Sequence, residues 1–214
     1  MAELYEYRTI RIQRAGWHAL RRDVGGAFSR ATSAAGGAVY ALFAGMIGFA
    51  TDEGVLMRTW RDDDAFATNG ERTMTALPGI VESRAERLVV GVRPLDASPP
   101  HGDGVYAHRW FWLQPQDWAE FQRLSDEGVW PYFESDGCNI IGLWRSAEPG
   151  PLAKALLITR YPSVAHWERT RLQSPDAPPG ADERLYRAAQ DAGRRRAELT
   201  ERSIVRLTRL LPPT

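Results

Sequence analysis

The sequence repeats itself at a spacing of 101 residues. Six positions of the first half carry the same or a similar residue 101 positions later: Tyr5 and Tyr106, Arg8 and Arg109, Gln13 and Gln114, Trp17 and Trp118, Trp60 and Tyr161, Phe66 and Trp167. An ordered series at one offset is the signature of internal repetition, which decides the architecture before any local pattern does. The sequence therefore predicts two copies of one unit.

Each half shows the same order of predicted elements. Alternation and apolar runs predict strands, and caps and turn residues bound the helices. The first half has strands at 4–12, 40–50, 55–60 and 88–92, with helices at 17–33 and after residue 62. The second half has strands at 105–113, 139–144, 155–161 and 204–211, with helices from 115, at 162–171 and at 181–197. Residues 99–104 form a linker rich in Pro and Gly between units 1–98 and 105–214.

The order strand–helix–strand–strand–helix–strand is ferredoxin-like. In such a unit the helices cover one face of a four-stranded antiparallel sheet and leave the other open. Two fused units can cover each other's open faces. The predicted fold is α+β, with two βαββαβ repeats forming a dimeric α/β-barrel-type unit.

Several short segments carry a family resemblance. They are Tyr5-Glu-Tyr-Arg8 with Gly16-Trp17, then Asp117-Trp118, Trp130-Pro-Tyr-Phe-Glu134, Ile141-Gly-Leu-Trp144, Arg160-Tyr161 and His166-Trp167-Glu168. Together these segments resemble the NIPSNAP family. The resemblance implies the dimeric α/β-barrel superfamily, which includes cofactor-free monooxygenases, haem-degrading enzymes, chlorite dismutases, cyclases and isomerases. It implies a ligand pocket, and it assigns no catalytic residue.

Composition narrows the class of protein. Basic and acidic residues balance at 27 each, which argues against a nucleic-acid-binding or polybasic membrane surface. The single cysteine, Cys138, excludes a disulfide framework and a multi-cysteine metal site. The sequence shows no membrane span and no signal peptide, so we expect a cytoplasmic protein.

Five residues are candidates for catalysis. His108 lies among aromatic residues on its strand and suits a general base. Arg8 and Arg109 occupy equivalent strand positions and could stabilise an anion, although a salt bridge with Glu6 or a helix carboxylate explains them better. Tyr106 and Tyr132 are candidate hydroxyl donors.

Aromatic residues are dense in the second half and predict an aromatic-lined cavity beside ordinary core packing. The candidate ligand-binding residues are Trp110, Trp112, Trp144 and Tyr7. No metal site is predicted, because no histidine has a partner at metal-ligand spacing. The run Arg194-Arg195-Arg196 is interpreted as an exposed helix face, with a self-association surface as the alternative.

The sequence thus favours a small-molecule enzyme of specialised metabolism, performing cofactor-independent oxygenation, cyclisation or isomerisation of a hydrophobic or aromatic substrate. A non-catalytic binding or scaffold protein is the alternative. Haem binding at His108 or His166 and a homodimeric state are kept as further alternatives.

Overall fold

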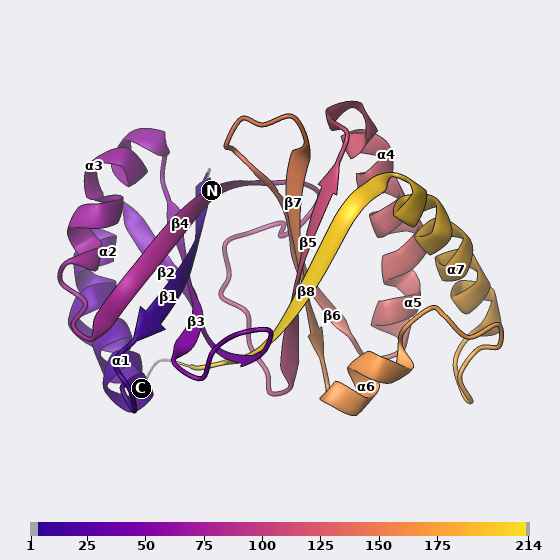
Figure 1. The fold of residues 1–214 in the computed structure, drawn as a ribbon, viewed down its shortest axis with the longest axis horizontal. Helices are drawn as coiled ribbons and strands as arrows, with labels where there is room; N and C mark the ends of the chain where they lie inside the picture. The colour runs from indigo at the N-terminus through magenta and orange to yellow at the C-terminus, as the bar shows by residue number, and fades with distance from the viewer. Residues whose placement is uncertain (1–3, 213–214) are drawn as a thin grey trace.

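Eight antiparallel strands form the centre of the protein in a computed structural model that describes residues 4–212. Their bounds are β1 (Leu4–Ile12), β2 (Gly37–Ile47), β3 (Glu53–Trp60), β4 (Ile80–Val90), β5 (Val105–Leu113), β6 (Asn139–Ser146), β7 (Ala153–Tyr161) and β8 (Thr200–Leu210). They close into a barrel in the order β1-β3-β2-β8-β5-β7-β6-β4 (Figure 1). The barrel joins two ferredoxin-like sheets through the β2–β8 and β4–β6 pairs, which confirms the predicted fold class.

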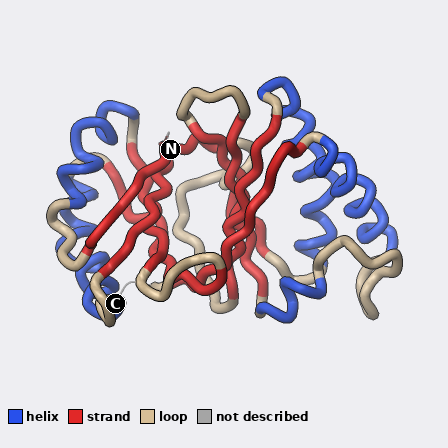
Figure 2. The backbone as a smooth tube through the Cα atoms, viewed as in Figure 1, coloured by secondary structure: helices blue, strands red, loops and turns tan. Residues whose placement is uncertain are grey.

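The helices flank this barrel on two sides (Figure 2). The first half contributes α1 (Trp17–Asp23), α2 (Ser29–Ala34) and α3 (Asp63–Met74), with a π-helical segment, Val24–Phe28, joining the first two. The second half contributes α4 (Trp118–Arg123), α5 (Trp130–Ser135), α6 (Val164–Arg169) and α7 (Glu183–Glu198), with a π-helical segment, Leu124–Val129, between α4 and α5. Among residues 4–212, no helix has the length and apolar character to cross a membrane.

Strand pairing places residues 101 positions apart at equivalent sites. Glu6 on β1 faces Arg58 on β3, and Ala107 on β5 faces Thr159 on β7. Ala107 lies 101 positions after Glu6, and Thr159 lies 101 positions after Arg58. Residues of these strands at that offset can therefore be compared as counterparts in the two halves.

Both faces of the first strand of each half are buried, although alternation such as that of residues 4–12 is typical of a strand with one exposed face. The inner face of β1 carries Tyr5 and Tyr7 into a barrel core shared with Tyr106, Trp110 and Trp144. The outer face packs under helices of its own half, where it forms a separate apolar cluster. Helices outside a closed barrel leave neither face to solvent.

Two strands begin at least four residues earlier than the sequence predicts. β4 begins at Ile80 rather than residue 88, and β8 begins at Thr200 rather than residue 204. The added segments are rich in charged residues and lack a strand-like apolar pattern. They form strands because β1 and β5 supply complete ladders of backbone hydrogen bonds, which override weak local propensity.

Helix α7 lies directly against the π-helical segment of the second half. A Cβ atom added at Gly128 would lie 2.3 Å from the Cβ of Ala192, so only glycine permits this approach. The carboxylate of Asp182 accepts a hydrogen bond from the Leu185 amide at 2.9 Å and caps the helix. These contacts fix the side of α7 that faces the sheet.

Candidate functional site

The first half places a closed network of charges between its sheet and helices. The buried carboxylate of Glu6 accepts hydrogen bonds from Arg8 Nε at 2.6 Å, from Arg58 at 2.8 Å and from Trp60 Nε1 at 2.8 Å. Arg8 also donates to Glu71 of α3 at 2.5 Å. Every charge in this network has an opposite partner, as buried ions require.

Burial and the neighbouring carboxylates have opposite effects on the pKa values of the arginines in this network. Burial lowers the pKa of Arg8, but hydrogen bonds and charge from Glu71 and Glu6 outweigh it and leave the pKa above its ordinary value. Burial dominates for Arg58 and lowers its pKa despite the attraction of Glu6. This arrangement is the core salt bridge that the sequence predicts for Arg8.

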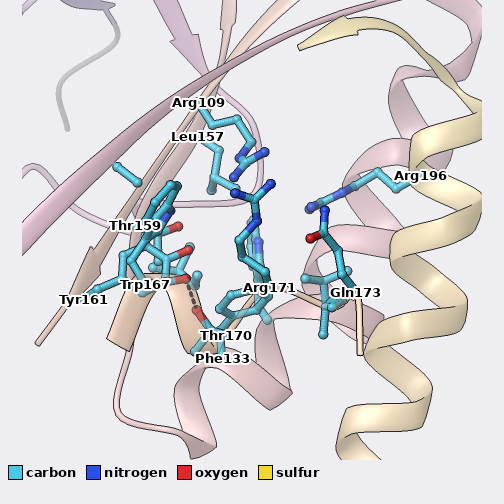
Figure 3. Close-up of a pocket in the computed structure, with 15 residues that line it drawn as sticks. Arg109, Phe133, Leu157, Thr159, Tyr161, Trp167, Thr170, Arg171, Gln173 and Arg196 are labelled. Atoms are coloured by element: carbon cyan, nitrogen blue, oxygen red, sulfur yellow. Dashed lines mark hydrogen bonds between the residues drawn. The ribbon is translucent and has the colours of Figure 1, made fainter. Parts of the chain in front are cut away.

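The counterpart place in the second half is hollow. Glu6, Arg58 and Glu71 correspond by the 101-residue offset to Ala107, Thr159 and Leu172. The charged network is thus replaced by small or apolar side chains, and a cavity of about 210 Å³ opens between the sheet and helices. We call it the arginine pocket; its polar and aromatic lining includes Arg109, Trp130, Phe133, Thr159, Tyr161, Trp167, Arg171, Gln173 and Arg196 (Figure 3).

Three arginines from separate elements converge on the arginine pocket. Arg109 comes from β5, Arg196 from α7, and Arg171 from the segment after α6; Figure 3 shows their guanidinium groups directed toward one another. Among residues 4–212, none of the three forms an ion pair with a carboxylate. Arg109, the counterpart of Arg8, therefore has no acidic partner.

Burial and mutual repulsion lower the pKa of two of these arginines. Burial lowers the pKa of Arg109, and the nearby charge of Arg171 lowers it further. Burial, assisted by Arg109, lowers the pKa of Arg196 to about 10. Arg196 donates a hydrogen bond to Ser125 Oγ at 3.2 Å, and its guanidinium packs over the rings of Phe111 and Phe121. With a pKa of about 10, Arg196 stays charged at neutral pH.

Two aromatic residues of the lining carry polar groups, and only Tyr161 is placed here as a donor to the pocket. Tyr161, the counterpart of Trp60, is buried, and burial raises the pKa of its phenol although Arg109 and Arg196 oppose the shift. The phenol therefore stays protonated. The indole Nε1 of Trp130 is buried and has no hydrogen-bond partner among the described residues. The pocket thus combines aromatic walls with the Tyr161 hydroxyl and cations.

The pocket residues do not fit haem. Axial haem ligands are His, Cys, Met or a deprotonated Tyr, and the described lining contains only Tyr161 of this set, held as the phenol. His166 is turned to Asp136, with Nε2 at 3.1 Å from the carboxylate. Within residues 4–212 no three His, Cys, Asp or Glu side chains converge as a metal site.

The predicted base, His108, lies in the closed barrel core. Its side chain is fully buried, with Nδ1 at 3.2 Å from the Tyr7 hydroxyl and Nε2 at 3.0 Å from Thr208 Oγ1. Burial, assisted by the charge of Arg206, lowers the pKa of His108 to about 3. Tyr106 is also in this core and donates to the backbone carbonyls of residues 101 and 102 at 2.9 Å. The structure brings neither residue to the arginine pocket.

The predicted aromatic residues divide between two places. Tyr7, Trp110 and Trp112 line a second cavity of about 210 Å³ at the barrel mouth, beside an ion pair of Lys154 with Glu86. Trp144 packs in the core, with its ring centroid 5.5 Å from that of Tyr5.

Tyr132 is fully buried under α7 against Tyr186. Of the predicted site residues, only Arg109 lies in the arginine pocket.

The sequence prediction missed most of the residues that line this pocket. The sequence predicts that the arginine run on α7 is an exposed helix face, and this holds only in part. Arg194 and Arg195 are exposed, whereas Arg196 is turned inward and lines the pocket. Tyr161 and Trp167 could have been found, since both are counterparts of residues in the repeat. Arg171 replaces Gly70 at the same offset and carries no local signal.

No family model matches the sequence, and no curated protein sequence matches it. Solved structures match the fold over nearly the whole chain. An anthrone oxidase-like protein is 14% identical with a TM-score of 0.62, covering 99% of this chain and 92% of its own. A monooxygenase candidate from Lactobacillus acidophilus NCFM is 9% identical, with a TM-score of 0.60 and coverage of 100% and 95%.

A chlorite dismutase variant from Candidatus Nitrospira defluvii is 12% identical, with a TM-score of 0.56 and coverage of 99% and 92%. At these identities the likeness concerns the fold alone. The structure neighbours are proteins of the dimeric α/β-barrel type.

Proposed function

We propose that this chain is an oxygenase-type protein whose arginine pocket binds a planar, hydrophobic or aromatic small molecule. The observation that carries the proposal is the contrast between the halves: side chains fill one site completely and leave its counterpart hollow. The same proposal includes a NIPSNAP-like origin by duplication, with units 1–98 and 105–214 joined at 99–104. The neighbours named after anthrone and monooxygenase chemistry support the reaction class.

The pocket can stabilise an anion formed on the substrate. Arg109 and Arg196 lie where an enolate or phenolate oxygen would be bound, and a preorganised cation in a site of low polarity lowers the pKa of a bound enol or phenol. The described lining holds no His, Asp or Glu to act as a base. Tyr161, as a protonated phenol, is suited to donate a hydrogen bond to the same oxygen.

Oxygenation of such an anion needs no bound cofactor. A substrate with an acidic CH2 group reacts with O2 to give a ketone and one water; the substrate supplies the electrons, and the second oxygen atom leaves in the water. The catalytic roles predicted for His108, Arg8, Tyr106 and Tyr132 stay predictions. The proposed chemistry uses none of them, because they lie outside the arginine pocket.

Oxygen consumption with anthrone as substrate tests the proposal. We expect uptake above the uncatalysed rate, and a loss of at least tenfold in Ala107→Gln, whose side chain enters the place that Glu6 fills in the first half. Ala85→Gln, which narrows the barrel-mouth cavity instead, is the matched control and keeps the activity. Equal rates in wild type and Ala107→Gln would overturn the proposed site.

A non-catalytic binding protein is the second candidate, and the absence of a general base among the described lining residues favours it. This function predicts saturable binding of 2-naphthol that Ala107→Gln abolishes, with no oxygen uptake. A homodimer is compatible with either function, and sedimentation of the purified protein measures it.

A further inference from the structure

We propose that the arginine pocket recognises an anionic aromatic molecule, an aryl carboxylate or an anion of the same shape, with its oxygen atoms between Arg109 and Arg196. The inference rests on the proposed function, because it names the ligand class of the same pocket. The proposed function names a planar hydrophobic or aromatic ligand, and the inference adds that this ligand carries a negative charge.

The charge of the pocket is the first observation. Its described lining contains three arginines and no aspartate or glutamate. Two of them, Arg109 and Arg196, are partly buried, and Arg171 lies at the exposed rim. A buried ion without an opposite partner is strongly unfavourable. An anion bound among the guanidinium groups removes this penalty.

The counterpart network gives the second observation. In the first half, the carboxylate of Glu6 is held between Arg8 and Arg58 and accepts a hydrogen bond from Trp60 Nε1. Ala107 takes the place of Glu6 in the second half, whereas the arginine on the same strand is kept. The second half therefore retains a carboxylate-binding arginine and lacks the carboxylate. A ligand carboxylate would occupy the place that an intramolecular one fills in the other half.

The third observation is the set of neutral polar groups beside the arginines. The Tyr161 hydroxyl and the Gln173 amide lie in the same lining. Both groups can donate hydrogen bonds to the oxygen atoms of a bound anion.

Size and walls specify the rest of the ligand. Trp130, Phe133 and Trp167 give the pocket aromatic walls, against which a flat ring packs. An apolar cavity of about 150 Å³ accommodates one benzene ring, so about 210 Å³ accommodates a ring with a carboxylate, and a second ring can extend toward the open side. A bare inorganic anion would leave the aromatic walls uncovered.

Calorimetric titration with 2-naphthoate and its neutral isostere 2-naphthamide tests the inference. We expect the wild-type protein to bind the acid at least tenfold more tightly than the amide. Arg109→Gln should lower the affinity for the acid at least tenfold and the affinity for the amide less than threefold. Arg187→Gln removes an exposed arginine of α7 that pairs with Glu183 at the surface, and it controls for net charge.

Each outcome separates the two proposals. Equal affinity for 2-naphthoate and 2-naphthamide, with both affinities lost in Ala107→Gln, would overturn the inference that the ligand is an anion. The proposed binding site in the arginine pocket would still stand. Failure of both compounds to bind, together with no oxygen uptake, would overturn the pocket as well. If inorganic phosphate displaced 2-naphthoate at equal concentration, the assignment of an aromatic ligand would be wrong. The melting temperature of each variant verifies that it is folded.

Discussion

Arg8 and Arg109 occupy the same position of strands that lie 101 residues apart, yet Arg8 contacts two carboxylates and Arg109 contacts none among the described residues. The difference arises from their neighbours: Ala107 occupies the position on β5 that Glu6 occupies on β1, and among the described residues no helix carboxylate pairs with Arg109 as Glu71 pairs with Arg8. One arginine thereby stabilises the fold, and the other is left facing a cavity.

Restoring the missing carboxylate should stabilise the second half. In Ala107→Glu, the new side chain would meet Arg109 as Glu6 meets Arg8, and we expect a free energy of unfolding at least ~1 kcal/mol higher than in Ala107→Gln. Urea denaturation measures both variants, which have the same size and differ only in charge. Equal stability would mean that Arg109 cannot reach the new group.

Removing the two counterpart arginines should have opposite consequences. Arg8→Gln deprives the buried Glu6 of a partner and should lower the free energy of unfolding by ~3 kcal/mol. Arg109→Gln removes a partly buried charge that has no acidic partner among the described residues, and it should leave the free energy of unfolding unchanged or raise it. Thermal and urea unfolding check the pair; a large loss in Arg109→Gln would show that this arginine already has a stabilising partner.

The buried His108 should make stability depend on pH. Its pKa is about 3 when folded and about 6.5 when unfolded, so below about 6.5 the unfolded chain binds a proton that the folded chain excludes. Stability is fully present above that pH and falls as the pH drops toward 3. Between pH 7 and 4.5 this single group contributes a loss of roughly 2–3 kcal/mol. The slope should flatten in His108→Gln when unfolding is measured at several pH values.

Trp144 should act in packing rather than in binding. It is fully buried in the barrel core, so Trp144→Ala should lower the free energy of unfolding by ~3–5 kcal/mol. We expect the affinity of the arginine pocket for 2-naphthoate to stay within threefold under conditions where the variant is folded. Trp112→Ala, at the barrel mouth, is the control and should cost less, because this side chain is only partly buried. A changed affinity in Trp144→Ala would return this residue to the ligand site.

The predicted fold followed from periodicity and repetition, both of which are local or one-dimensional properties of the sequence. Alternation in residues 4–12 and 105–113 identified strands, and the repeat implied that two open sheet faces would cover each other. The early part of β4 escaped prediction, since its strand state depends on pairing with β1 rather than on its own residues. The ion pair of Arg8 with Glu6 was accessible because both lie on one face of one strand.

The candidate site was accessible only in part. Arg109 was identified from its place in the repeat, whereas Arg196 and Arg171 come from distant segments that only the packing of α7 and the loop after α6 brings to the same cavity. By itself, the sequence predicted the fold class and most of its strands, and it placed Arg8 and Arg109 at equivalent strand positions. The tertiary structure decided which charges meet a partner, because neutralisation of a buried ion depends on atoms within a few ångströms, and those atoms come from elements far apart in the chain.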